Sequence, residues 1–207
     1  MLAEEEFPHG LAHAAQIIPI IDRLTRAQGW SPADLNELYI SAGPGSFTGL
    51  RIGITLAKTL ALARGVKLVA VPTVAVLAEN APADAKNLVL VLDAKRDQIF
   101  TARFERAGGQ WIEREPAHVD SLSAMLHRAP RPVHLLGEGI PQHRKFVPSD
   151  DAGIIQTPEE LWRPRAGIVA RLGFELARRG VFADPDSLTP IYIRKPEAQE
   201  KWEAAQH

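Results

Sequence analysis

Residues 41–61, SAGPGSFTGLRIGITLAKTLA, decide the fold of this chain. A β-prone run, residues 38–40, leads into a turn with three glycines and a proline, and an apolar, alanine-rich segment follows without a break. Glycine permits backbone angles that other residues avoid, and Ser46 and Thr48 are both residue types that cap helices. The pattern therefore predicts a strand, a tight loop and a helix over residues 48–63 that stops at Gly65.

The glycine loop allows two interpretations. A loop at a helix N-terminus points backbone N–H groups at whatever lies above it, which makes it a candidate anion site. The spacing of Gly43, Gly45 and Gly49, however, matches neither the phosphate-binding pattern GxxxxGK[ST] nor the dinucleotide-binding pattern GxGxxG. Because glycine also marks close backbone packing, the residues alone favour a packing loop over a ligand site.

The composition limits the classes of function. The 207 residues carry a formal net charge of −1, with a pI of about 6.7. A protein that grips nucleic acid by itself usually has a basic patch or a high pI, so strong direct binding of nucleic acid is not expected. The absence of cysteine excludes disulfides and thiolate metal sites. No apolar run could span a bilayer and no signal peptide is recognisable, so we expect a cytoplasmic protein.

Strand and helix signals alternate along the chain and predict an α/β architecture with two lobes, residues 1–85 and 86–207. A polar segment, residues 81–87, is the expected hinge. We expect helices over residues 11–27, 48–63, 73–80, 121–128 and 166–179, and strands over residues 38–41, 67–71, 88–93, 98–104, 111–115, 133–136 and 191–193. The first two strands should be parallel, because a helix connects them.

The segment GPGSFTGLRIG, residues 43–53, resembles the signature of the bacterial tRNA threonylcarbamoyladenosine biosynthesis family TsaB, also called YeaZ. Three other segments are similar to motifs of the family in the same order: His13 with IIPII at residues 17–21, LDAKR at residues 92–96, and PIYIR at residues 190–194. The resemblance covers nearly the whole chain and implies the two-lobed actin-like fold (ASKHA, ribonuclease-H-like).

One part of the family pattern is absent. TsaB proteins open with a strand hairpin before the first helix, and the sequence given starts at about the end of that region. The resemblance therefore implies a truncated first lobe, in which strands 38–41 and 67–71 have unpaired edges. Unpaired strand edges favour aggregation, so we expect low stability.

The resemblance implies a non-catalytic subunit. TsaB is a degenerate paralogue of the transferase TsaD; it binds and activates TsaD and helps to recruit the ATPase TsaE. Contact with tRNA would then be indirect, and no cofactor, metal or catalytic residue is expected. Two alternatives stay open: a self-associating homodimer that uses the same helices, and a fragment related to actin-like kinases or metallopeptidases.

Two helices form the candidate interface with TsaD. Gly53, Ala57 and Ala61 recur every four residues and form a stripe of small side chains, while bulkier residues form a second apolar side. Such a helix needs two partners, of which one is its own sheet. By resemblance, the expected partner-binding residues are His13, Ile17, Ile20, Leu24, Gly53, Ile54, Ala57 and Ala61, and the signature loop consists of Gly43, Pro44, Gly45, Ser46, Phe47, Thr48, Gly49 and Arg51. On this interpretation Ala57→Arg abolishes heterodimerisation and leaves the fold intact.

The histidines give no convincing site. His9 and His13 are four residues apart, which is a metal-ligand spacing, but no third ligand is identifiable and a polar role at the start of the helix is favoured. Four more histidines lie on different expected elements: His118, His127, His134 and His143. Structural or surface roles are expected for them.

Asp93 is the most interesting carboxylate, because it ends an apolar strand. Ligands often bind at the carboxyl ends of strands in open α/β sheets. The residues that follow, Lys95, Arg96 and Asp97, are all charged, however, and favour a salt-bridged turn. These cations, with Arg194, are expected to contribute at most weak attraction to phosphates.

Overall fold

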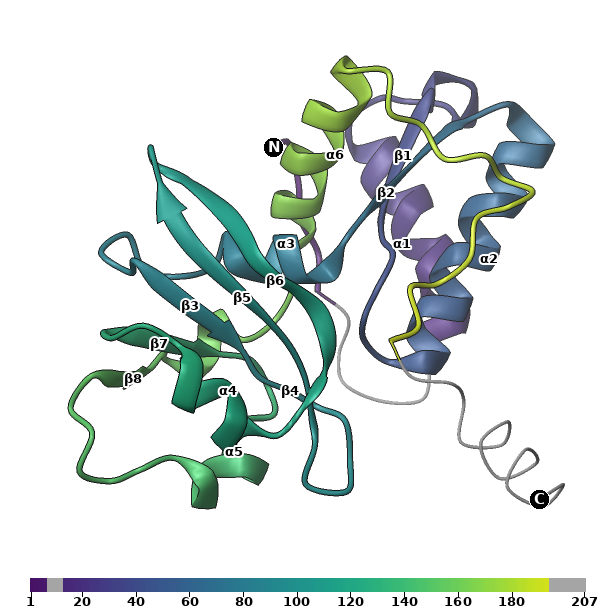
Figure 1. The fold of residues 1–207 in the computed structure, drawn as a ribbon. Helices are drawn as coiled ribbons and strands as arrows, with labels where there is room; N and C mark the ends of the chain where they lie inside the picture. Colours follow the sequence, from purple (N-terminus) through teal and green to yellow (C-terminus); the bar gives the residue numbers. More distant parts are fainter. Residues whose placement is uncertain (7–12, 194–207) are drawn as a thin grey trace, which may run out of the picture. The chain divides into compact units, whose positions relative to one another are not determined.

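The computed structural model describes residues 1–6 and 13–193 (Figure 1). This part of the chain divides into two compact units. Unit 1 comprises residues 1–76 and 164–190, and unit 2 comprises residues 77–163 with 191–193. The division differs from the expected one in two ways: the first unit ends earlier, and residues 164–190 return to it from the far end of the sequence.

Two parallel strands, β1 (Glu37–Ser41) and β2 (Lys67–Val71), form the sheet of unit 1. The helix α2 (Phe47–Arg64) connects them, so the expected strand, loop, helix and strand are confirmed. The other elements of the unit are α1 (His13–Ala27), the short 3-10 turn η1 (Pro32–Asp34), the helix α6 (Ala166–Arg178), and α3 (Thr73–Ala78), which crosses the division between the units.

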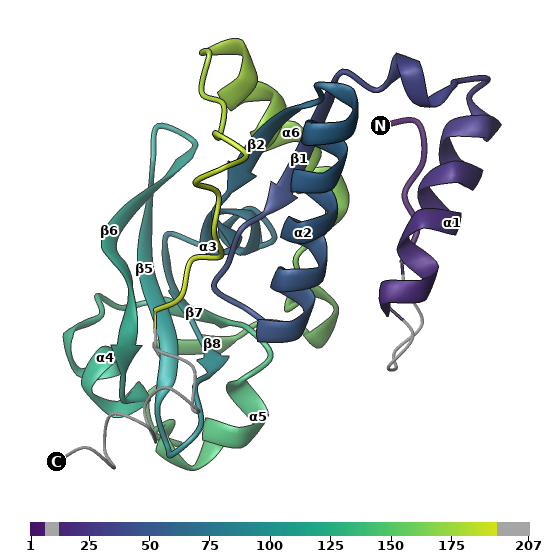
Figure 2. The same ribbon diagram turned by 90° about the vertical axis from the view of Figure 1, so that its right-hand side faces the viewer.

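Helices cover both faces of this sheet, because successive side chains of a strand point to opposite faces. Leu38 and Ile40 of β1 pack with α2, whereas Tyr39 packs with α6. Figures 1 and 2 show β1 and β2 between α2 and α6. The approach of α6 is close: a Cβ atom on Gly173 would lie 2.5 Å from Cγ of Tyr39. A glycine is therefore required at this crossing.

The ends of α2 follow from local sequence signals. The side chain of Ser46 caps the N-terminus by accepting a hydrogen bond from the N–H of Gly49, at 3.3 Å. At the other end Gly65 has a left-handed φ of 70°, and its N–H donates to the carbonyl of Ala61. A glycine adopts this conformation without steric cost, so the helix stops where the sequence predicts.

Unit 2 contains a six-stranded mixed sheet. The strand order is β4-β5-β3-β7-β8, and β6 pairs with β5. The strands are β3 (Asn87–Leu90), β4 (Leu92–Asp93), β5 (Ile99–Ala107), β6 (Gln110–Asp120), β7 (Val133–Leu136) and β8 (Ile154–Gln156). The helical segments are α4 (Leu122–Arg128), α5 (Ile140–His143), η2 (Arg144–Phe146) and η3 (Glu159–Leu161).

The core of unit 2 lies between the sheet and α4. Val89, Val133 and Leu135 from the strands pack against Leu122 and Met125 of α4, and all five are fully buried. Burial of each such side chain stabilises the fold by about 1.5–3 kcal/mol. The long hairpin β5–β6 turns at Gly108 and Gly109, where both residues have positive φ, a conformation that glycine adopts without steric cost.

Residues 191–193 form no strand, which corrects one expectation. Ile191 and Tyr192 are exposed, and among the described residues no strand edge pairs with them. The β-prone run at residues 191–193 therefore belongs to no sheet. Residues 11 and 12, predicted to open the first helix, and Arg194 lie outside the described residues.

Candidate functional site

The signature loop is fastened to the start of α3 by one side chain, Thr73. The Thr73 hydroxyl accepts a hydrogen bond from the N–H of Gly43 at 3.0 Å and lies 2.7 Å from the hydroxyl of Ser41. The N–H of Thr73 in turn donates to the carbonyl of Gly43, at 2.8 Å. Thr73 is 5% exposed. These contacts favour the packing interpretation of the loop.

A shallow pocket of about 320 Å³ borders this loop. Its walls include Pro44, Gly45 and Ser46 of the loop, Gly49 of α2, and Thr73. None of the described residues that line it is a lysine, an arginine or a histidine. The pocket therefore offers an anion no charged partner, only the hydroxyls of Ser41, Ser46 and Thr73 and backbone N–H groups at the helix N-terminus, which is weak support for a phosphate site.

The first turn of α2 carries an exposed aromatic and an exposed cation. The guanidinium carbon of Arg51 lies 3.8 Å from the centre of the Phe47 ring, which is a cation–π contact. Phe47 is 39% exposed. Both residues belong to the expected signature loop, and both present surface beside it that another molecule could contact.

The small-residue stripe of α2 faces the protein's own sheet. Ala57 is completely buried, and Ile54 and Ala61 pack with Leu68 of β2 in the same cluster. A Cβ atom on Gly53 would lie 3.3 Å from Cδ1 of Ile40. The expectation that this stripe is a surface is thereby corrected. Ala57→Arg would place a charge in the core, so it would destabilise the fold and could not isolate partner binding.

The outward side of α2 is also apolar. Ile52 and Leu56 are half-buried, Ala63 is exposed, and these residues lie on the side of the helix opposite Ile54 and Ala57. Leu62 is 71% exposed. The helix therefore has the two apolar sides that the sequence predicts. The side with small residues packs on the sheet, and the bulkier side faces outward.

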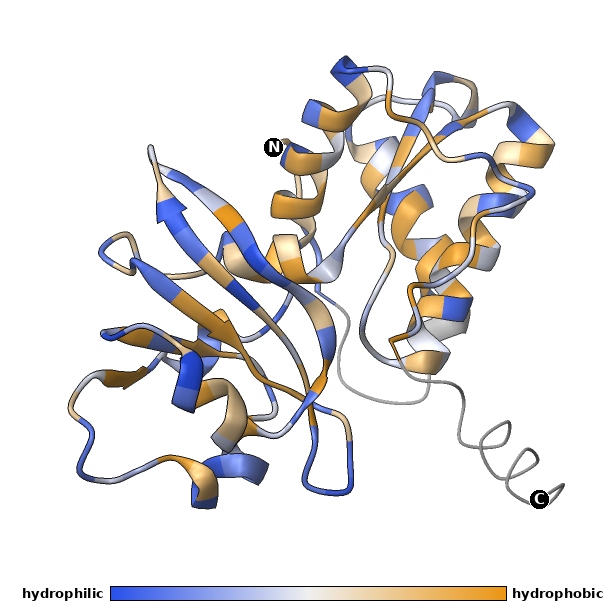
Figure 3. Ribbon diagram, viewed as in Figure 1, coloured by the Kyte–Doolittle hydropathy of each residue, from blue (hydrophilic) through white to orange (hydrophobic). Residues whose placement is uncertain are grey.

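The first helix also combines inward and outward apolar residues. Ile20 is buried, Ile17 and Leu24 are half-buried, and Ile18 is 52% exposed. Figure 3 shows hydrophobic residues along both α1 and α2. The side chain of His13 and the whole of His9 lie outside the described residues, so the structure does not address the expected role of either.

Asp93 lies in a salt-bridged turn, as the sequence favours. Its carboxylate accepts hydrogen bonds from the N–H and the ammonium of Lys95, and Nε2 of the buried His143 lies 3.3 Å from Oδ1. Burial by itself would raise the pKa of Asp93, but these hydrogen bonds hold it below its usual value. His143 thus has a structural role that the sequence did not connect with Asp93, because 50 residues separate the two.

The turn after Asp93 has an unusual backbone. Lys95, Arg96 and Asp97 have φ values of 64°, 55° and 58°, which non-glycine residues adopt uncommonly. An ion pair of 2.8 Å between Asp97 and Lys145 helps to hold the turn.

Burial raises the pKa of the neighbouring Glu138 carboxyl. Within the described residues, no group of three or more histidine, aspartate or glutamate side chains could hold a metal ion.

Known structures share the arrangement of both units. Unit 1 has a parallel strand pair joined by a glycine loop and a long helix, and unit 2 has a mixed sheet. A solved structure of YeaZ from Pseudomonas aeruginosa superposes with a TM-score of 0.71 at 21% identity, covering 89% of this chain and 86% of that one. A second crystal structure, of a protein with similarity to peptidase YeaZ from the same organism, gives a TM-score of 0.72 at 22% identity and covers 88% of this chain and 84% of that one. The fold is therefore the two-lobed, actin-like fold of these proteins.

The family model of TsaD, tRNA N6-adenosine threonylcarbamoyltransferase, matches residues 10–149. The protein TsaB of Bacillus subtilis is 31% identical over 195 residues, which cover 92% of this chain and 83% of that protein. TsaB of Escherichia coli is 27% identical over 201 residues, which cover 91% and 84%. The chain thus belongs to the class of TsaD-like proteins. Within that class it is a member of the TsaB family, tRNA threonylcarbamoyladenosine biosynthesis proteins.

Proposed function

We propose that this chain takes part in tRNA threonylcarbamoyladenosine biosynthesis as a non-catalytic subunit that binds and activates a TsaD-type transferase. Membership of the TsaB family supports the pathway. The observation that supports a binding role is the set of outward apolar residues on α1 and α2, above all Ile18 and Leu62. Both helices thus expose apolar residues, and a protein interface is one place where such residues become buried.

The site chemistry supports a scaffold more than an enzyme. Thr73 holds the signature loop in place through its contacts with Gly43 and Ser41, and none of the described residues lining the pocket beside the loop is charged. The titratable groups at Asp93, namely Lys95 and His143, have a structural role, because their contacts with Asp93 stabilise the turn. We infer that the subunit acts by favouring a competent conformation of its partner.

The remaining partners follow from the same proposal. A TsaE-like ATPase would join through the complex, and tRNA would contact the assembled complex more than this chain, whose net charge is −1. Within the described residues, no helix has the length and apolar content to cross a membrane. The cytoplasm is the compartment that we propose for this complex.

Isothermal titration against TsaD from the same organism tests the proposal. We expect submicromolar affinity, which corresponds to a binding free energy beyond about −8 kcal/mol. A folded sample, shown by circular dichroism and a cooperative melt, that produces no binding heat would contradict the partner role. ATP turnover by the isolated chain would support the kinase-related alternative instead.

A homodimer through the same helices is a second candidate, because the outward apolar residues of α1 and α2 could cover each other in two copies. Light scattering of the isolated chain separates this form from a monomer. If the homodimer is a resting form, adding TsaD should convert it into the heterodimer.

A further inference from the structure

Two loops at one end of unit 2 bring exposed cations together. One is the turn after β4, and the other is η2, which follows α5. Figures 1 and 2 both place the two loops at the same end of the unit. The exposed cations of the two loops form what we call the basic cluster: Lys95, Arg96, Arg144 and Lys145. The fold therefore creates a charged surface that neither loop forms by itself.

Contacts between the two loops hold the basic cluster in place. Nζ of Lys145 lies 2.8 Å from Oδ1 of Asp97, and Nε2 of the buried His143 lies 3.3 Å from Oδ1 of Asp93. The backbones also approach closely, since a Cβ atom on Gly139 would lie 2.7 Å from the nitrogen of Asp93. The cations are therefore presented from loops that are fixed to each other.

The backbone of the first loop supports a binding role. Lys95, Arg96 and Asp97 all have positive φ, between 55° and 64°, which is unfavourable for residues with a side chain. Unfavourable backbone conformations persist where the surrounding structure enforces them, and they are concentrated at functional sites. The contacts with the second loop enforce this conformation, so that two cations lie in a turn of fixed shape.

Positive charge predominates on the outer surface of the two loops. The side chains of Lys95 and Lys145 are 84% and 61% exposed. The same loops contain three carboxylates, but the side chain of Asp93 is only 12% exposed. Asp97 and Glu138 are exposed, so four exposed cations stand against two exposed carboxylates. Such a surface attracts a polyanion weakly, which agrees with the net charge of −1 for the whole chain.

The basic cluster lacks the apolar surroundings of a protein interface. None of the large hydrophobic side chains that are exposed in the described structure lies at residues 93–97 or 137–146. The core of a protein interface is apolar, whereas surfaces that contact nucleic acid are more polar and positively charged. Arginine and lysine are also the side chains that bind phosphate groups. The composition therefore favours a phosphodiester backbone over an acidic protein.

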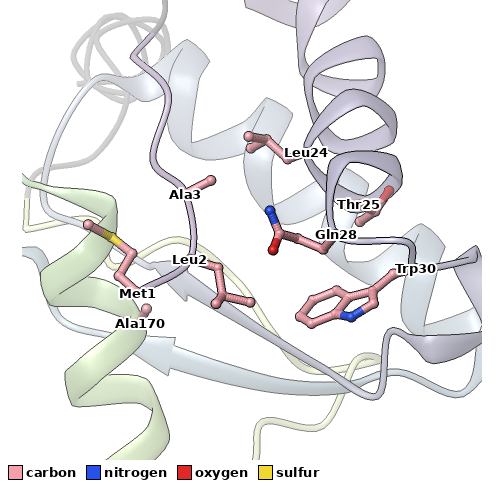
Figure 4. A pocket seen from close by; sticks show the side chains of 8 residues that line it. All are labelled: Met1, Leu2, Ala3, Leu24, Thr25, Gln28, Trp30 and Ala170. Atoms are coloured by element: carbon pink, nitrogen blue, oxygen red, sulfur yellow. The ribbon is translucent and has the colours of Figure 1, made fainter.

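Two pockets of unit 1 offer no comparable charge. An apolar pocket of about 330 Å³ lies between residues 1–3 and the side chains of Leu24, Gln28 and Trp30 (Figure 4). None of the described residues that line it has a charged side chain, and the same holds for the pocket beside the signature loop. Of these three places, the basic cluster is therefore the best suited to phosphate.

We propose that the basic cluster contacts the phosphodiester backbone of RNA, as part of the surface that the assembled complex offers to tRNA. The proposal rests on the proposed function of the chain in tRNA modification. Phosphate contacts position a nucleic acid and do not read its sequence. The cluster would thus help to orient tRNA, while a partner supplies most of the affinity.

NMR titration of the full chain with a synthetic RNA hairpin tests the contact. At low salt we expect weak binding, with a Kd on the order of 10⁻⁴ M, and the largest amide shift changes at residues 95–97 and 144–145. Polyglutamate serves as the comparison for an acidic protein and should bind more weakly. Because this measurement needs no partner, its failure can be distinguished from a failure of TsaD binding, which isothermal titration measures. No binding, shift changes confined to other residues, or equal binding of polyglutamate overturns the proposal.

Variants at Arg144 separate charge from structure. Arg144→Gln should weaken RNA binding about threefold to tenfold at low salt and reduce the slope of log K against log salt by about 0.7–0.9, because one phosphate contact is lost. Arg144→Lys keeps the charge and should retain the slope of the parent. Lys86→Gln removes an exposed cation just before β3, at the other end of that strand, and is the matched control. A parent-like slope in Arg144→Gln, or an equal loss in Lys86→Gln, would remove the basic cluster from the RNA contact.

Discussion

At the residue scale, Thr73 shows how one hydroxyl organises the signature loop. It accepts from the N–H of Gly43 and contacts Ser41, and so joins the end of β1 to the start of α3. The sequence predicts a helix that begins at Thr73, but shows no sign of its bond to a loop 30 residues away. Gly43 is buried, so its N–H has no access to water as a substitute partner.

Thr73→Val tests this role. The variant keeps the shape of the side chain and leaves the buried N–H of Gly43 without an acceptor. We expect a loss of about 1–3 kcal/mol in the free energy of unfolding, measured by urea denaturation. Thr59→Val on the exposed side of α2 is the matched control and should change stability little. Equal stability of the two variants would show that the hydroxyl does not hold the loop.

At the element scale, α2 is defined by its two apolar sides. The side with the small residues Ala57 and Ala61 meets the sheet, because small side chains allow the helix to lie close to β1 and β2. The bulkier Leu56 and Leu62 remain on the other sides of the helix. A partner would therefore meet the larger residues, and a variant that tests binding has to lie there or on α1.

Ile18→Arg on α1 provides that variant. Ile18 is half-exposed, so the substitution should leave the melting temperature within a few degrees of the parent, while a charge in an apolar interface should weaken TsaD binding at least about tenfold. Phe174→Arg on α6, where Phe174 is exposed to a similar extent, is the matched control. Isothermal titration measures both. Parent-like affinity of Ile18→Arg would remove α1 from the proposed interface.

At the scale of the whole molecule, unit 2 depends on paired carboxylates. Glu115 accepts hydrogen bonds from Arg103 at 2.7 Å and from Arg128 at 2.9 Å, and Arg128 also donates to Asp120 at 2.6 Å. Burial by itself would raise the pKa values of Glu115 and Asp120. The hydrogen bonds and positive charge of the arginines have the larger combined effect and hold both pKa values below their usual values. The pKa of Asp93 is lowered in the same direction.

The pH dependence of stability follows from these signs. A carboxyl group with a lowered pKa stabilises the fold at pH values above its unfolded pKa, and this contribution is lost as the pH falls through the folded pKa. Melting temperatures should therefore be constant near neutral pH. They should decrease once the pH drops below the usual pKa values of these carboxyl groups, 4.5 for Glu115 and 3.8 for Asp120. Glu115→Gln should lower the neutral-pH value and flatten the fall. A Glu115→Gln profile parallel to the parent would contradict the assignment.

The sequence determined the parts of this protein that depend on neighbouring residues. The glycines of the loop, Ser46 and Gly65 set the strand, loop and helix, and the contiguous residues 43–53 are enough to indicate the TsaB family. Periodicity also located β2, β7 and α6 closely. The prediction of a strand was wrong at residues 191–193, where a run of three β-prone residues pairs with no strand.

Only the tertiary structure decided the features that depend on residues far apart in the chain. A helix that is apolar on two sides does not indicate which side meets its sheet, so the burial of Ala57 and the exposure of Leu62 required the position of β1 and β2. The return of residues 164–190 to unit 1, the contact of Thr73 with Gly43 and the pairing of His143 with Asp93 have the same origin. In each case, long-range packing fixes a contact that local propensity leaves open.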